Sequence, residues 1–414
     1  MIKTRPYKLL LLMLISTKLM GQGDKVDSSE MRILRIDPSN AKGASISQVF
    51  EEVKFIPLET TKESLFGTIS QLKVTTDRYV IWDNDTKSIL IFNKNGKYQA
   101  KINGSKVDKD PASMGQQSFN GFNLVNENNE QVIQVTAGKY NYFFDLNARL
   151  IRKVKGERYF SKDRFDDGTI VDLGYLEKKG TDSTYFELSL VKEKKRVQSF
   201  FPYSMLKYKT DLFFTAGEPI TNYGKDNEFF FIRPYEYSIY KVTPKQLSLA
   251  YSLYFPQENS LPIDFLSNPA YKGKRREFFE KNPKIFYGIG SAYEIGNNLF
   301  FKVVSWSWGR DERKAFIYNL KKNVITSITD LEPDSLSQFL PVTDAGLGGD
   351  FANRGILRFD GTHFYTSYSS LVLFTVKEQN DGKNRIYEPI LNEYFKTQSK
   401  KSNPVIIQLR PRKT

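Results

Sequence analysis

Tyr79–Ile102, YVIWDNDTKSILIFNKNGKYQAKI, is the most informative segment for predicting the fold, because its pattern occurs twice in the chain. Gln131–Val154, QVIQVTAGKYNYFFDLNARLIRKV, aligns with it without a gap at an offset of 52 residues. In both stretches, apolar runs of four to seven residues alternate with turns rich in Asn, Asp and Gly, which tolerate positive φ. Each copy therefore predicts a meander of short antiparallel strands.

The same turn signal recurs down the chain, each time before an aromatic or β-branched run. The six marks are Asp77-Arg78, Asn128-Asn129, Asp167-Gly168, Asp226-Asn227, Asn297-Asn298 and Asp360-Gly361. Their mean spacing is about 57 residues, and a four-stranded propeller blade with its loops needs about 40–50. We therefore predict an all-β fold, a six-bladed β-propeller of four-stranded antiparallel blades, as a single domain over residues 23–414 with short helical insertions.

A propeller ring closes when strands from the two ends of the chain share a blade. Val53–Leu58 (VKFIPL) and Pro404–Leu409 (PVIIQL) are apolar segments at opposite ends, and we expect them to pair in the last blade. Two β-sandwiches in tandem are the structural alternative, but they leave the 52-residue repeat unexplained. Helical spacing predicts short helices in Ser45–Glu52, Tyr271–Lys281 and Glu388–Thr397.

The N-terminus has the pattern of a secretory signal peptide. Residues 1–22 combine a basic start with the apolar run Leu9–Ile15 and end near small residues. The alternative, a membrane anchor, needs about 20 apolar residues, and Lys18 interrupts any extension of this run. Without Cys there is no lipid attachment site of the lipoprotein type. We predict export to the periplasm or the cell surface, and no membrane span.

The net charge of +14 would suggest a nucleic-acid partner, but its location argues against one. Four of these charges lie in residues 1–22 and six in Lys396–Thr414, which leaves residues 23–395 at +4. The basic runs Lys192–Arg196 and Lys272–Arg276 are interpreted as solvated loops. We expect no nucleic acid among the partners.

Composition removes several kinds of catalytic site. Zero Cys excludes disulfides and thiolate metal sites, and His363 as the single His excludes a multi-His zinc site. No G-x-S-x-G motif is present for a serine hydrolase. Calcium needs only oxygen ligands, and Asp83, Asn84 and Asp85 form a short cluster of that kind, but we interpret it first as a hairpin turn, because no EF-hand spacing is present. We assign no cofactor, metal ligand or catalytic residue.

The candidate ligand-binding residues are aromatic and charged. Trp306 and Trp308 alternate along one strand with Arg310 after them, so both indoles can face one surface and stack on a sugar or anchor a peptide. Asp350 and Arg354, in and after a Gly-rich turn, are predicted at the same rim. His363 follows a turn and is predicted to face the channel or a neighbouring blade. Packing between blades is the alternative role of the two Trp residues.

Several segments resemble one known group, the secreted six-bladed β-propeller proteins common in Bacteroidetes, which are related to NHL-type propellers and largely of unknown function. The resemblance is carried by Val53–Leu72, Tyr79–Ile102, Ala345–Phe351 and Lys401–Arg410. Where many members have a Gly-Pro-Gly-Glu turn, this chain has Asp108–Phe119, DKDPASMGQQSF, so ligand contacts at that turn do not carry over. The resemblance implies the fold and no specific chemistry.

These observations lead to two hypotheses of different classes. The first is an exported, monomeric, non-enzymatic propeller that binds a glycan, a peptide or a partner protein at the channel mouth, because loops on a rigid scaffold carry recognition. The second is a metal-dependent hydrolase or lyase with carboxylate ligands in the channel. The first accounts for the sequence with fewer assumptions, so we favour a protein that is not an enzyme.

Overall fold

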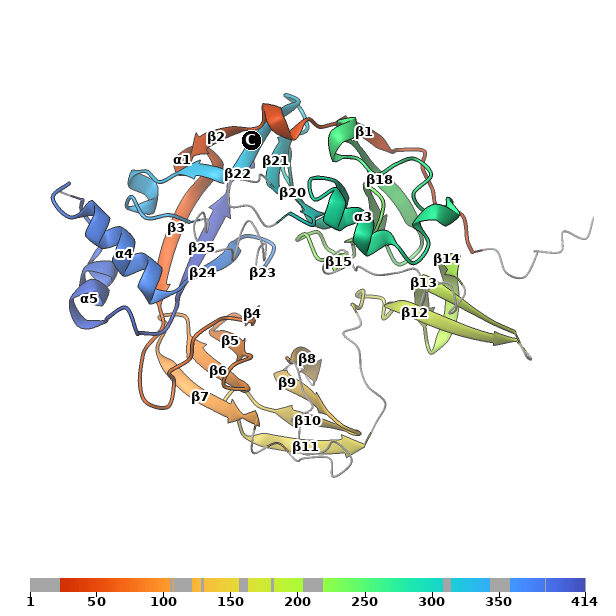
Figure 1. The fold of residues 1–414 in the computed structure, drawn as a ribbon. Coiled ribbons are helices and arrows are strands. Elements are labelled where there is room, and N and C mark those ends of the chain that lie inside the picture. Colours follow the sequence, from red (N-terminus) through yellow and green to blue (C-terminus); the bar gives the residue numbers. More distant parts are fainter. Residues whose placement is uncertain are drawn as a thin grey trace, which may run out of the picture.

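A computed structural model shows six β-sheets arranged around a common axis (Figure 1). It describes residues 23–104, 107, 121–127, 130–155, 163–179, 182–203, 219–307, 314–342, 358–383 and 385–413. The predicted all-β propeller with six antiparallel blades is confirmed. The predicted signal peptide, residues 1–22, lies outside the described residues.

The first three blades follow the predicted turn marks. Blade I contains β4 (Gln71–Val74), β5 (Arg78–Asp83), β6 (Ser88–Asn93) and β7 (Tyr98–Asn103). Blade II contains β8 (Asn123–Glu127), β9 (Glu130–Ala137), β10 (Tyr140–Phe144) and β11 (Leu150–Lys155). Blade III contains β12 (Ile170–Lys179), β13 (Asp182–Lys192) and β14 (Lys195–Tyr203). The 52-residue repeat therefore covers strands two to four of blades I and II.

The last three blades complete the ring. Blade IV contains β15 (Ile220–Thr221), β16 (Phe229–Ile232), β17 (Ser238–Val242) and β18 (Leu247–Tyr254). Blade V contains β19 (Phe286–Ile295), β20 (Asn298–Ser305), β21 (Ala315–Asn319) and β22 (Val324–Glu332). Blade VI contains β23 (Arg358–Phe359), β24 (Phe364–Tyr368), β25 (Val405–Pro411) and β3 (Phe50–Pro57).

Blade VI closes the ring as the sequence predicts. Strand β25 pairs antiparallel with β3, with Leu409 opposite Val53 and Ile406 opposite Ile56. Ile406, Ile407 and Leu409 are fully buried, so the closing strand belongs to the core. The two ends of the chain are thus held together by a ladder of backbone hydrogen bonds and by apolar packing.

An N-terminal strap, residues 24–57, ends in β3, and the part that precedes β3 was not foreseen. Within it, β1 (Arg32–Arg35) pairs parallel with β18, and β2 (Lys42–Ser45) pairs parallel with β22. At its start, the Asp24 amide donates to the Ser199 carbonyl of blade III at 2.6 Å. Figure 1 shows this segment running around the outside of the ring before it enters blade VI as β3. Blades IV and V therefore have five strands where four were expected.

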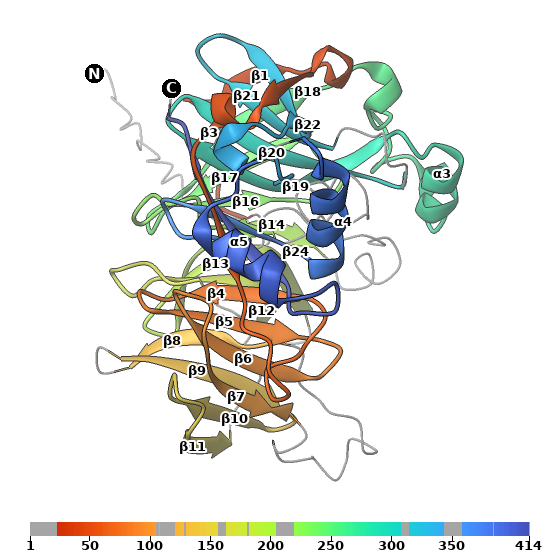
Figure 2. The ribbon, with the colours of Figure 1, turned by 90° about the vertical axis from the view of Figure 1, so that its left-hand side faces the viewer.

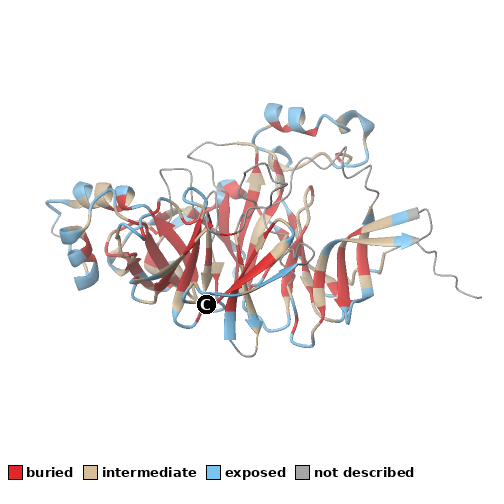
Figure 3. Ribbon diagram, turned by 90° about the horizontal axis from the view of Figure 1, so that it is seen from below, coloured by how far each residue is buried: buried red, intermediate tan, exposed pale blue. Residues whose placement is uncertain are grey.

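The buried apolar side chains lie between neighbouring blades (Figure 3). One cluster joins blades I and II, one joins VI and I, one joins III and IV, and the largest spans IV, V and VI. Among the described residues, no such cluster joins blades II and III. Each blade is too thin to bury its own faces, so the stacking of neighbours supplies the core.

The propeller has two distinct ends. The turns between the first and second strands of blades I, IV, V and VI lie at one end together with the turn before β12 of blade III, and we call this end the turn face. The C-terminal segment lies at this end, where the Asn297 amide of the β19–β20 turn donates to the Lys413 carbonyl at 3.3 Å. The opposite end, the helical face, carries residues 255–285 with α3 (Arg275–Lys281). In Figure 2, α3 and the C-terminus lie on opposite sides of the ring.

The helices are short and peripheral. They are η1 (Pro38–Asn40), α1 (Ile46–Val49), η4 (Gln257–Asn259), η5 (Pro269–Tyr271), α3, η6 (Ser335–Ser337), α4 (Ser370–Asn380) and α5 (Pro389–Thr397). The predicted helix at Ser45–Glu52 stops at Val49, because β3 begins at Phe50. Helix α4 was not predicted. In the described part of the chain, no helix is long and apolar enough to cross a membrane.

Candidate functional site

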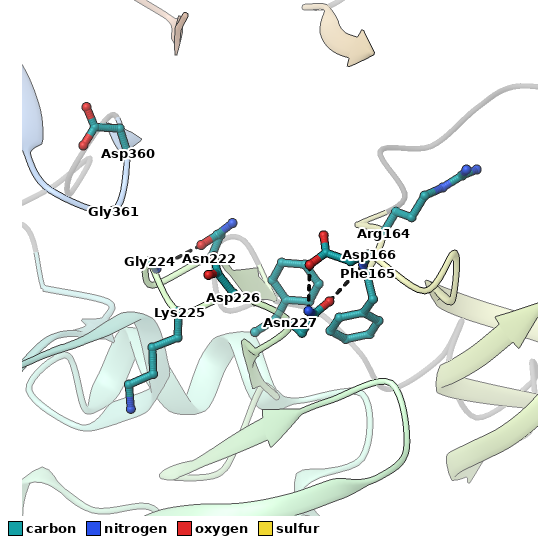
Figure 4. A pocket seen from close by; sticks show the side chains of 11 residues that line it. Arg164, Phe165, Asp166, Asn222, Gly224, Lys225, Asp226, Asn227, Asp360 and Gly361 are labelled. Atoms are coloured by element: carbon teal, nitrogen blue, oxygen red, sulfur yellow. Dashed lines mark hydrogen bonds between the residues drawn. The ribbon is translucent and has the colours of Figure 1, made fainter. Parts of the chain in front are cut away.

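Turns from three blades converge on a polar hollow of about 220 Å³ at the turn face (Figure 4). Blade III contributes the segment before β12, blade IV the β15–β16 turn, and blade VI the β23–β24 turn. The lining residues are Arg164, Phe165, Asp166, Asn222, Gly224, Lys225, Asp226, Asn227, Phe229, Asp360 and Gly361. Most are polar turn residues, so the hollow offers hydrogen-bonding groups on a rigid frame.

Hydrogen bonds of Asx type fix these turns. The Asn222 side-chain oxygen accepts the Gly224 amide at 2.9 Å. Asp166 and Asn227 bind each other across blades III and IV: the Asp166 amide donates to Asn227 Oδ1 at 2.8 Å, and Asn227 Nδ2 donates to Asp166 Oδ2 at 2.7 Å. Asn227 has a φ of 56°, which Asn tolerates better than most residues. The turn chemistry thus links two neighbouring blades.

Two glycines let the turns of blades IV and VI approach each other. Gly224 has a φ of +85°, and a Cβ added there would lie 2.7 Å from Gly361 Cα and 2.7 Å from Phe359 Cε1. Only glycine fits both the left-handed backbone and this close approach. Blade V lies between these blades in the chain, yet its own β19–β20 turn is held by the C-terminal segment at Lys413.

Asp360 lines the hollow and also accepts a hydrogen bond from Tyr365, which lies at the seam, the boundary between blades VI and I. Its Oδ1 accepts the amides of Thr362 at 2.9 Å and His363 at 2.7 Å, and its Oδ2 accepts the Tyr365 hydroxyl at 2.7 Å. Burial raises the pKa of Asp360, but the hydrogen bonds from His363, Tyr365 and Thr362 outweigh this and hold the pKa below its usual value. Asp360 is therefore ionised and its oxygens are occupied.

The seam between blades VI and I places an aromatic and cationic group beside Asp360. Tyr79 of β5 packs edge-on against Tyr365, with ring centroids 6.1 Å apart. The Lys94 ammonium, from the β6–β7 turn, lies 4.6 Å above the Tyr79 ring. Burial, together with the negative charge of Asp360, raises the pKa of Tyr79 to about 12. Burial lowers the pKa of Lys94, although Asp360 and Asp77 act against this.

His363 lies at this seam on the turn face. Its Nδ1 is 3.7 Å from Asp360 Oδ2, and its Nε2 accepts from Arg410 Nε at 3.4 Å. Arg410 in turn pairs with Glu52 of the strap at 2.8 Å. The histidine thus connects the β23–β24 turn to the closing strands.

The other predicted binding residues lie elsewhere. Trp306 follows β20 at the helical face, where it packs partly buried against Tyr235, Phe265 and Phe279 of the aromatic cluster under α3. The Arg276 guanidinium lies 5.9 Å from its ring centroid. The structure therefore does not bring Trp306 and His363 together. Trp308, Arg310, Asp350 and Arg354 lie outside the described residues.

In the sequence, four of the lining residues were recognised only as markers of the blade repeat. Asp226-Asn227 and Asp360-Gly361 were among the six turn dipeptides, and both line the hollow. Lys94 and Tyr79 lie within the repeat itself and were not singled out. The signal that could have found them is geometric: in an up-and-down meander, the first turn and the third turn of each blade share one face.

The acidic cluster at Asp83, Asn84 and Asp85 forms the β5–β6 hairpin turn at the helical face. Asp83 Oδ2 accepts the Thr86 amide at 2.9 Å, and Lys87 Nζ donates to Asn84 Oδ1 at 2.7 Å. Within the described ranges, no group of three or more His, Cys, Asp or Glu side chains could hold a metal ion.

Comparison with known proteins defines the class and then the family. The chain is a six-bladed β-propeller with a polar mouth of Asx turns. A family model described as a domain of unknown function (DUF4934) matches residues 33–410, and the protein belongs to that family. No protein with a curated description matches it.

Solved structures support the fold. A protein of Bacteroides fragilis whose given name describes it as exported has a TM-score of 0.59 and 14% identity, covering 92% of this chain and 100% of its own. A member of the DUF4221 family from Bacteroides vulgatus has a TM-score of 0.39 and 10% identity, covering 87% of this chain and 98% of its own. At 14% identity, the likeness to the B. fragilis protein shows the fold alone.

Proposed function

We propose that the protein is an exported, non-enzymatic binding module that recognises a small polar ligand, a glycan or a peptide, at its turn face. The observation that carries this proposal is the convergence of turns from blades III, IV and VI on one polar hollow. Hydrogen bonds within the turns of blades IV and VI, and between blades III and IV, fix these turns. Their polar groups are therefore pre-organised, which lowers the entropic cost of binding.

Export is proposed from the signal-peptide pattern of residues 1–22. The name of the B. fragilis neighbour, which describes that protein as exported, supports this proposal. The test is expression of the full chain in a Bacteroides host, followed by fractionation and N-terminal sequencing. A mature N-terminus near Gly23 in the periplasm or at the cell surface supports export. An intact Met1 in the cytoplasm contradicts it.

A glycan and peptide array on the purified mature chain tests binding. A hit that is lost in Asp226→Ala or Asn222→Ala, but kept in Trp306→Ala, assigns it to the turn face. Loss only in Trp306→Ala would move the site to the helical face and overturn the turn-face assignment. Metal analysis of the same preparation tests the hydrolase or lyase alternative, and about one bound metal ion per chain would favour that alternative.

A further inference from the structure

The outer edge of blade II is open to solvent. It consists of residues 149–155, which we call the blade II edge, and it contains β11. Five of the six residues of β11 are exposed, and Arg152 is half-buried. Figure 1 shows β11 as the outermost strand of its blade. In the described part of the chain, no strand pairs with the outer side of β11, so alternate backbone N–H and C=O groups on that side lack a strand partner.

The outer strands of four other blades are covered, wholly or in part, by other segments of the chain. β18 of blade IV pairs with β1, and β22 of blade V pairs with β2. In blade III, the Ser199 amide of β14 donates to Asp24 Oδ2 at 2.7 Å. In blade I, the Tyr98 amide of β7 donates to Glu59 Oε2 at 2.9 Å. The strap strands therefore show that the outer edge of a blade in this propeller accepts a fifth strand.

The regular part of the blade II edge has the same length as the strap strands. β1 and β2 have four residues each, and β1 pairs along its whole length with Tyr251–Tyr254. β11 keeps a regular register with β10 over Arg152–Lys155, opposite Tyr140–Phe143, and the bulge of this pair lies before that segment. A segment as short as a strap strand is therefore long enough to cover the regular part of the edge.

The blade II edge is basic. Residues 149–155 carry four cationic side chains and no acidic one. Two of these cations interact with blade II itself: Arg152 pairs with Glu127, and the Lys153 ammonium lies 4.2 Å from the centroid of the Tyr140 ring. The edge thus combines unpaired backbone groups with a positive charge that is not balanced within the edge.

The other two cations, Arg149 and Lys155, are exposed and form no ion pair with any residue that the structure describes. A second copy of this strand would place like charges opposite each other, which opposes pairing between copies. An extended segment with Glu or Asp at alternate positions would instead place carboxylates beside these cations. The charges that prevent indiscriminate pairing therefore favour an acidic strand from a different protein.

We infer that the blade II edge binds another protein by taking up a fifth strand from it, an extended segment in which apolar residues alternate with Glu or Asp. Hydrogen bonds between the two backbones hold the segment in register, and its carboxylates pair with Arg149 and Lys155. Its apolar side chains cover Leu150, Ile151 and Val154, which are otherwise exposed. None of residues 149–155 lines the turn-face hollow, so this interaction goes beyond the proposed function and does not depend on it.

The probe that tests this inference is a fluorescein-labelled octapeptide, capped at both ends, in which Val and Glu alternate. Fluorescence anisotropy measures its binding to the mature chain beside two reference peptides, one of alternating Val and Lys and one of alternating Pro and Glu. The Val–Glu peptide should bind at least about tenfold more tightly than the Val–Lys peptide, because opposite charges across a strand pair attract and like charges repel. The Pro–Glu peptide has the same charge but fewer backbone donors, so it should bind at least about tenfold more weakly than the Val–Glu peptide.

A charge reversal in the protein tests the same contact from the other side. The double variant Arg149→Glu/Lys155→Glu should reverse the preference, so that the Val–Lys peptide binds more tightly. The matched control is Lys321→Glu/Lys322→Glu in the exposed β21–β22 turn of blade V, which changes the net charge equally and should leave the preference as it is. Hydrogen exchange should show that amides within residues 149–155 become protected when the Val–Glu peptide binds.

The contrary outcomes are distinct from one another. Equal affinity for the Val–Glu and Pro–Glu peptides would show attraction between charges without strand pairing, and would overturn the inference. Binding that is lost in Asp226→Ala, with the amides of β11 unprotected, would assign the peptide to the turn face, which supports the proposed function and overturns this one. A dimer of the mature chain in analytical ultracentrifugation that dissociates in Arg149→Glu/Lys155→Glu would make a second copy the occupant.

Absence of binding by the Val–Glu peptide up to about 1 mM would also overturn the inference, because a specific strand contact is expected to be tighter than that. The glycan and peptide array would still decide the proposed function, since it reports on the turn face. Thermal melting of each variant shows whether an altered affinity reflects an altered fold.

Discussion

Blades V and II are built from the same four-stranded meander, but their outer edges differ. In blade V, β22 is covered by β2 of the N-terminal strap. In blade II, β11 is the last strand of its sheet, and Leu150, Ile151 and Val154 on it are 55%, 53% and 41% exposed. A long exposed edge invites pairing with other chains, and the Arg and Lys residues of β11 oppose it. Edge protection is therefore concentrated in blades IV to VI, where strands of the strap pair with the blades.

The core follows the same division. One large cluster spans blades IV, V and VI, whereas blades I and II share a smaller one, and none of the described clusters reaches from blade II to blade III. We infer that the strapped half of the ring, blades IV to VI, contributes more to the free energy of unfolding. Substitutions at the ring closure and at the turn face should therefore cost more than substitutions at exposed positions of blades II and III.

The largest difference is expected at the closing strand. Ile407→Ala removes a fully buried side chain from β25, and this should lower the free energy of unfolding by about 2–5 kcal/mol. Ile151→Ala on β11 removes a half-exposed one and should change it by less than about 0.5 kcal/mol. Urea unfolding followed by fluorescence measures both. Equal losses would contradict the idea that closure dominates stability.

The next difference concerns the glycines of the turn face. Gly168→Ala in blade III forces a φ of +82° on alanine but meets no atom within 4 Å, so about 1–2 kcal/mol is expected. Gly224→Ala adds a clash with Gly361 and Phe359, and a further loss of about 1–3 kcal/mol should follow. The same denaturation series tests this. If Gly224→Ala costs no more than Gly168→Ala, the turns of blades IV and VI do not touch in solution.

A smaller effect is expected where the C-terminal segment meets the strap. Arg412 Nε donates to the Ser47 carbonyl at 2.7 Å, so Arg412→Met should lose about 1 kcal/mol while keeping the aliphatic stem. Lys139→Met on blade II is the control, and its melting temperature should stay within the error of the parent. If the melting temperature of Arg412→Met matches that of this control, the Arg412–Ser47 hydrogen bond does not stabilise the closure.

The smallest expected effect is a dependence of the free energy of unfolding on pH. The pKa of Asp360 is depressed below its ordinary value of 3.8, so its contribution is present above about pH 4 and is lost as the pH falls through the folded-state pKa. Since Asp360 is half-buried, solvent screening limits the effect to below about 1 kcal/mol. Asp360→Asn should be slightly less stable at pH 6, and its deficit should shrink near pH 2–3. A deficit that is constant with pH would assign the effect to packing alone.

The number of blades and the two closing strands were predictable from the sequence alone. Alternation of apolar runs with Asn, Asp and Gly turns is a local signal, and it recurs wherever the chain reverses between strands. The pairing of Val53–Leu58 with Pro404–Leu409 was predictable because apolar ends of a ring fold have few other partners. Two of the turn dipeptides that marked the blades, Asp226-Asn227 and Asp360-Gly361, also line the hollow.

The strap, the shape of the hollow and the packing between blades VI and I could be seen only in the tertiary structure. The strap strands RILR and KGAS have four residues each, too few for a periodic signal, and they form because the edges of β18 and β22 offer unpaired backbone groups. Gly224 of blade IV lies against Gly361 of blade VI, although blade V separates them in the chain, and no sequence spacing encodes this contact. Tyr79 of blade I packs against Tyr365 of blade VI because closure makes the first and last blades neighbours. Trp306 and His363 lie apart because the eight-residue strand β20 separates the two faces.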